Sequence, residues 1–112
     1  MRRHFSRSAR RARLAALALM LATGGSVAAQ ERELLYARSL AASCAQCHGT
    51  DGRPAAGSSL PPLAGVPRDE LVAQLKAFKA GSRPATVMHQ LSKGYSDAQI
   101  ELIASYFAAQ TR

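Results

Sequence analysis

The sequence predicts an all-α domain of three main helices joined by long loops. Three segments carry apolar residues at the i, i+3, i+4 spacing of an amphipathic helix. Glycine and proline gather between these segments, where they favour turns and irregular backbone. We find no convincing strand after residue 29, so a sheet is not expected.

The first helix is predicted over residues 31–44, and its apolar face consists of Leu34, Ala37, Leu40, Ala41 and Cys44. The second opens at Pro67 and Asp69 and ends at Gly81, with Leu71, Leu75 and Phe78 on one face. A capping box, Ser96-Asp97-Ala98-Gln99, starts the last helix. This helix extends to about Gln110, with Ile100, Ile103, Tyr106 and Phe107 apolar. We expect the first and last helices to cross, with Ala37 or Ala41 facing Tyr106 and Phe107.

Two segments are predicted to be loops. Residues 49–65 are rich in glycine and include the consecutive prolines Pro61 and Pro62, which exclude a helix there. Residues 83–94 are expected to form a connecting segment with Pro84 near its start.

The first 29 residues have the pattern of a secretory signal peptide. Six arginines within positions 1–13 precede the apolar run 14–22, and Val27-Ala28-Ala29 provides small residues before a cleavage site. The alternative is an uncleaved anchor, but the run is shorter than the ~20 residues of a spanning helix. We therefore expect cleavage after Ala29, export to a bacterial periplasm and a mature domain of residues 30–112 without stable membrane insertion.

The net charge of +8 does not indicate a nucleic-acid partner. From Gln30 onward the chain has nine basic and seven acidic residues. Nucleic-acid binding requires a sustained basic surface that releases counterions from phosphates. This function class is therefore excluded for the mature domain.

The two cysteines lie in Cys44-Ala-Gln-Cys47-His48, the C-x-x-C-H attachment sequence for c-type haem. Residues three apart share one helix face, so both thiols can add to the two vinyl groups at one edge of a porphyrin. The adjacent His48 then presents an imidazole nitrogen to the iron. Three other interpretations of these residues are weaker. A thioredoxin-like pair needs a βαβ context, which the chain lacks, and a zinc site needs four strong ligands. A disulfide between Cys44 and Cys47 would close too short a loop to stabilise the domain.

One covalent haem also explains how so short a domain is stabilised. A chain of 83 residues buries a small core and usually needs a disulfide, a metal or a large prosthetic group. Loops this long are unusual in a small domain, but they can wrap and pack against a flat apolar disc. The prediction is therefore three main helices and long loops wrapped around one haem.

The iron needs a sixth ligand or is left open for chemistry. Met88 is the only methionine after residue 29, and a thioether raises the potential relative to a second histidine. The alternatives are His89, the next residue, an open distal site, or a Met88 that only fills the core. Position alone favours Met88 and leaves these alternatives open.

The whole mature chain resembles a class I c-type cytochrome. The segments 44–52, 63–65 and 78–81 resemble haem modules of dihaem periplasmic cytochromes, and the run 83–97 is most similar to the cytochrome subunit of flavocytochrome c sulfide dehydrogenase. This resemblance implies that Met88 is the distal ligand. It also implies that a proline carbonyl accepts the N–H of the proximal imidazole, at Pro61 or Pro62, of which we favour Pro61. With one attachment motif, the chain would be a single-haem version.

With both axial positions filled, the expected function is outer-sphere electron transfer, not enzymatic catalysis. The expected partner is the flavoprotein subunit of a sulfide dehydrogenase, which would dock tightly through an apolar patch. The alternatives are a freely diffusing carrier to an oxidase or reaction centre, and a haem sensor or enzyme with an open distal site. A diffusing carrier would dock through a charged rim, for which Lys76, Lys79, Arg83 and Lys93 are candidates.

Overall fold

The computed structural model describes residues 25–112, and this part of the chain contains helices, turns and loops but no strand. Residues 25–33 and 34–112 fall into two separate units, and the packing described below is that of residues 34–112. None of the helices in the described part is both long and apolar enough to cross a membrane. The apolar run 14–22 of the predicted signal peptide lies outside the described residues.

The first helix extends over residues 25–41, earlier at its start than predicted, and the predicted cleavage site after Ala29 lies within it. It then tightens into the 3-10 turn η1 (Ala42–Cys44), followed by the short helix α2 (Ala45–His48). Ala37 and Ala41 are buried as expected, but Leu34 is 58% exposed. The prediction for Leu34 is wrong because the core contacts one turn of this helix further on, where small residues allow close approach.

The second and last helices agree with their sequence signals. Helix α3 (Arg68–Ala80) ends at Gly81, which has a left-handed φ of 76° and donates its N–H to Ala77 and Phe78. Helix α5 (Asp97–Ala108) begins with the predicted capping box. The Ser96 hydroxyl accepts the N–H of Gln99 at 3.2 Å, and the Gln99 side chain accepts the N–H of Ser96 at 2.9 Å.

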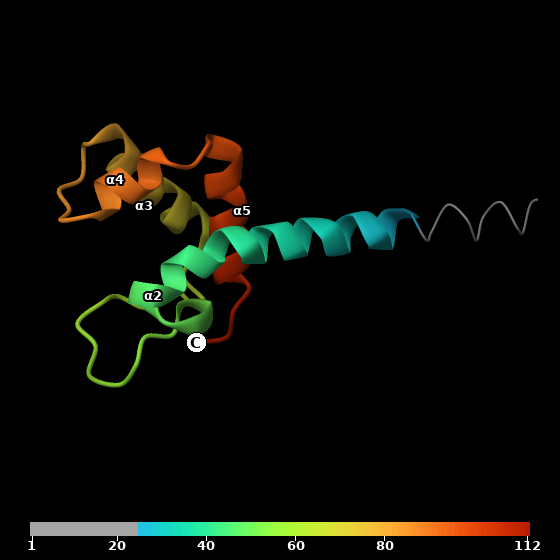
Figure 1. The fold of residues 1–112 in the computed structure, drawn as a ribbon, viewed down its shortest axis with the longest axis horizontal. Helices are drawn as coiled ribbons and strands as arrows, with labels where there is room; N and C mark the ends of the chain where they lie inside the picture. The colour runs from blue at the N-terminus through green and yellow to red at the C-terminus, as the bar shows by residue number, and fades with distance from the viewer. Residues whose placement is uncertain (1–24) are drawn as a thin grey trace, which may run out of the picture. The chain divides into compact units, whose positions relative to one another are not determined.

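The segment 83–94 contains a helix where the sequence predicts only a connection. Helix α4 (Met88–Lys93) spans six residues and packs against α3 (Figure 1). A helix this short cannot display a 3.6-residue repeat, and its stability comes from packing and not from local signals. The prediction of an irregular connection therefore fails for these six residues.

The core lies where α3, α5 and the helix 34–41 meet. Its fully packed members are Ala37, Ala41, Leu71, Ile103, Ala104, Tyr106 and Phe107. The two alanines share this cluster with Tyr106 and Phe107, as predicted. Small side chains on one helix and aromatic rings on the other allow the backbones to approach while the rings fill the space between them.

The loop after α2 is folded back on itself around a glycine. The turn η2 (Thr50–Gly52) is followed by a long loop whose far end comes back to Gly52. The N–H groups of Leu63 and Ala64 donate to the carbonyl of Gly52 at 2.9 and 3.1 Å. Gly52 has a φ of 78°, and a Cβ at this position would lie 2.7 Å from the Ala64 nitrogen. Only glycine combines this conformation with this contact.

Replacing Gly52 by alanine should therefore destabilise the domain by about 2–4 kcal/mol, from backbone strain and overpacking together. Gly57 is a matched control, because it has a similar φ of 82° and a Cβ added there would meet no atom within 4 Å. Gly57→Ala should cost only the strain, about 1 kcal/mol. Chemical denaturation of the two variants measures the difference, and equal losses would show that the close packing at Gly52 contributes nothing.

Candidate functional site

The attachment segment lies across the junction of η1 and α2. Cys44 ends η1, and Cys47 and His48 form the last two residues of α2. Neither cysteine forms a disulfide; Cys44 is half-buried and Cys47 is exposed. Burial raises the pKa of the Cys44 thiol, and a hydrogen bond from the Ser43 side chain offsets part of that rise. The helical backbone places the two thiols three residues apart on one side of this segment.

The His48 side chain is held by a hydrogen bond at its Nδ1. Its side chain is buried, with 9% exposure, and its Nδ1 lies 2.8 Å from the carbonyl oxygen of Pro61. Because a carbonyl can only accept, Nδ1 is the donor in this bond, and in the neutral imidazole the lone pair is then on Nε2. The sequence left Pro61 and Pro62 as candidates for this carbonyl, and in the structure the Pro61 carbonyl contacts His48.

Met88 comes from a different element from the other candidate residues. It is the first residue of α4 and is partly buried. The end of α4 is tied to the attachment segment by the hydroxyl of Tyr95, which lies 2.7 Å from the hydroxyl of Ser43. His89, the alternative ligand, has a buried Nδ1 with no hydrogen-bond partner among the described residues.

These residues fit a covalently attached haem. A proline carbonyl fixes the tautomer of His48 so that Nε2 is the nitrogen able to bind iron. Three large apolar side chains in the segments that carry Pro61 and Met88 are left 41–50% exposed, namely Leu60, Val87 and Leu91, as expected of residues that pack against an apolar disc. Within residues 25–112 no group of three or more His, Cys, Asp and Glu side chains could hold a metal ion.

An all-helical fold with two thiols and an oriented imidazole on one short segment defines a haem-binding protein of the c type. The sequence model of the cytochrome c family, described as "Cytochrome c", matches residues 36–110. The chain therefore belongs to the cytochrome c family. It has the class I cytochrome c fold and, as a member of this family, a covalently bound haem c.

Three known proteins illustrate the relationship. The chain is 46% identical over 68 residues to the "Cytochrome subunit of sulfide dehydrogenase" of Chlorobaculum tepidum, covering 61% of this chain and 60% of that protein. It is 44% identical over 70 residues to the "Thiosulfate dehydrogenase electron acceptor" of Thiomonas intermedia, covering 61% of this chain and 31% of that protein. A solved structure of cytochrome c4 from Acidithiobacillus ferrooxidans aligns with a TM-score of 0.55 at 36% identity, covering 59% of this chain and 37% of that one.

Two contacts in the site region could not be predicted from the sequence. The Tyr95–Ser43 bond joins residues 52 positions apart, and the hydroxyl of Tyr106 donates to Asp51 across 55 positions. No local sequence pattern predicts either contact, because each depends on how α5 and the turn before it pack against the attachment segment. Their only sequence signal is a polar aromatic residue on or beside the apolar face of a helix.

Two of the four cations of the candidate charged rim, Lys76 and Lys79, are paired with acids. The Lys79 ammonium lies 2.8 Å from Asp97, and the Lys76 ammonium lies 3.2 Å from Glu101. The hydrogen bond and charge of Lys79 hold the pKa of Asp97 below its usual value. Arg83 stacks over the ring of Phe78, with its guanidinium carbon 4.8 Å from the ring centre. Paired cations present a weaker field to an approaching partner.

Proposed function

We propose that this chain is a periplasmic carrier with a single haem, held by Cys44, Cys47, His48 and Met88. The two thiols would form the thioether links, and Nε2 of His48 and the sulfur of Met88 would bind the iron. A haem held in this way would supply one-electron chemistry between the ferrous and ferric states of its iron. The observation that carries the proposal is the hydrogen bond between Nδ1 of His48 and Pro61, which leaves Nε2 free to bind.

The protein groups in this proposal position the ligands and exclude other chemistry. The Pro61 carbonyl orients the imidazole and increases its basicity. A neutral thioether from Met88 suits both oxidation states and closes the distal side to substrates. The same ligands in both states keep the reorganisation small, so the chain is suited to pass electrons without binding a substrate at the iron.

As electron donor we propose the flavoprotein subunit of a sulfide-oxidising enzyme. The similarity to the cytochrome subunit from Chlorobaculum tepidum supports this assignment. The pairing of Lys76 and Lys79 with acids favours an apolar docking patch over a charged rim. The chain spans 60% of the length of that relative, so the flavoprotein partner is a proposal for this chain.

The second candidate is a diffusing carrier that receives electrons from another sulfur-compound dehydrogenase. It is supported by the similarity to the electron acceptor of thiosulfate dehydrogenase from Thiomonas intermedia. This alternative shares the haem, the ligands and the compartment with the first. It differs in the partner and in how long the two proteins stay together.

Purification from the native periplasm separates the two candidates. We expect the chain to begin at Gln30 and to elute with a flavin-containing protein at both low and high ionic strength. An apolar interface survives salt, whereas a charged one dissociates. A protein that elutes alone at every ionic strength would exclude the permanent subunit and favour the diffusing carrier. A chain found only in the cytoplasm, with residues 1–29 retained, would contradict the export common to both.

A further inference from the structure

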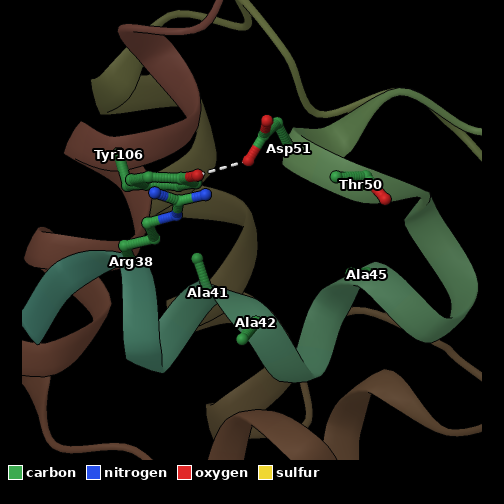
Figure 2. Close-up of a pocket in the computed structure, with 7 residues that line it drawn as sticks. All are labelled: Arg38, Ala41, Ala42, Ala45, Thr50, Asp51 and Tyr106. Carbon is green, nitrogen blue, oxygen red and sulfur yellow. Dashed lines mark hydrogen bonds between the residues drawn. The ribbon is translucent and has the colours of Figure 1, made fainter. Parts of the chain in front are cut away.

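The hydroxyl of Tyr106 makes a partly buried contact with the loop that follows the attachment segment. The Tyr106 residue is 8% exposed, and its hydroxyl donates to Oδ1 of Asp51, shown by the dashed line in Figure 2. Burial raises the pKa of Tyr106, the bond to Asp51 raises it further, and Arg38 beside it offsets part of the rise. The phenol therefore stays protonated at neutral pH and remains a donor.

Asp51 has an unusual backbone conformation that this bond helps to hold. Its φ of 54° is the one positive value at a non-glycine residue in the described part of the chain. Aspartate tolerates this conformation better than most residues, but it needs local support. A pocket of about 190 Å³ is lined by Thr50, Asp51 and Tyr106 together with Arg38 and three alanines of residues 41–45. The hydrogen bond therefore links Asp51 to α5 beside a space that is left open (Figure 2).

The same turn of α5 holds the far end of the loop. The carbonyl of Phe107 accepts the N–H of Gly65 at 2.9 Å, while the carbonyl of Gly52 accepts the N–H groups of Leu63 and Ala64. Two consecutive residues of α5 therefore fix both ends of the segment 51–65. Pro61 lies within this closed segment, two residues before Leu63, and its carbonyl meets Nδ1 of His48.

We propose that Tyr106 is a positioning residue for the haem-bound histidine. Through Asp51 it holds the loop in the conformation that keeps the Pro61 carbonyl on Nδ1 of His48. This inference rests on the proposed role of His48 as an axial ligand. A strong hydrogen bond at Nδ1 makes the imidazole more basic and stabilises ferric iron, so loss of the Tyr106 hydroxyl should weaken that bond and raise the reduction potential.

The test replaces Tyr106 by phenylalanine in the exported holoprotein, which removes the hydroxyl and keeps the buried ring. The reduction potential should rise, and the Nδ1 proton of His48 should exchange with water at least several-fold faster in NMR spectra of the ferrous protein. Asp51→Asn keeps an acceptor oxygen and tolerates the left-handed backbone, so it should retain both wild-type values. Asp51→Ala should behave like Tyr106→Phe.

Tyr36→Phe is the matched control for the loss of a tyrosine hydroxyl. The Tyr36 hydroxyl accepts a hydrogen bond from Gln99 at 2.9 Å, remote in sequence from the loop, and its removal should leave the potential and the Nδ1 exchange unchanged. A Tyr106→Phe protein that is less stable but has both wild-type values would show a merely structural role and overturn the inference. Wild-type spectra in which the His48 ring is not bound to iron would instead refute the proposed function.

Discussion

Replacing Cys44 and Cys47 together by alanine is expected to give a chain that carries no covalent haem and is largely unfolded. The buried core is small: it consists of two alanines of the first helix and of side chains from α3 and α5. Domains of this size are only marginally stable, by about 5–15 kcal/mol, and here a haem would supply much of the apolar surface that the long loops bury. Removing both attachment points removes this contribution together with the covalent tether.

The comparison uses exported proteins, measured by absorption spectra after denaturation and by far-ultraviolet circular dichroism. Gln46→Ala is the matched control, since this residue lies between the two cysteines and is exposed. It should keep a full complement of haem and the wild-type helix content. A double-cysteine variant that retains helix content and unfolds as cooperatively as the wild type would contradict the view that the haem completes the core.

Replacing Met88 by alanine is expected to open the iron to an external ligand. Loss of the thioether should let the ferrous protein bind carbon monoxide stoichiometrically, where the wild type binds almost none. It should lower the reduction potential, and the weak sulfur-to-iron absorption band of the ferric protein should disappear. The helix α4 itself should persist, because alanine is the strongest helix former.

His89→Ala is the control for Met88→Ala, because the two residues are neighbours at the start of α4. Adjacent residues on a helix point about 100° apart, so one helix turn cannot present both to the same iron. The His89 variant should keep the absorption band and stay closed to carbon monoxide. The opposite pattern, with the band intact in Met88→Ala and carbon monoxide binding in His89→Ala, would assign the ligand to His89.

Much of the fold follows from short-range signals in the sequence. Gly81 ends α3 and the capping box at Ser96 starts α5, and both act within a few residues of their own position. The attachment motif is also local, since Cys44, Cys47 and His48 fall within five consecutive positions. Such features can be predicted because backbone geometry alone relates the residues involved.

The remainder depends on contacts between distant segments. Helix α4 is too short to show a repeat and is stabilised by α3, and Leu34 is exposed because the core begins one turn after it. The choice between Pro61 and Pro62 depends on how the loop closes at Gly52. The Tyr106–Asp51 bond likewise exists only once α5 has packed. None of these can be predicted from spacing along the chain.

The most direct test of the central claim is the intact mass of the exported wild-type protein, measured with and without a thiol-alkylating reagent. We expect the mass of residues 30–112 plus that of one haem, with no added alkyl group, because both sulfurs are already bonded to the porphyrin. A mass equal to that of the polypeptide alone, with Cys44 and Cys47 both alkylated, would contradict the account.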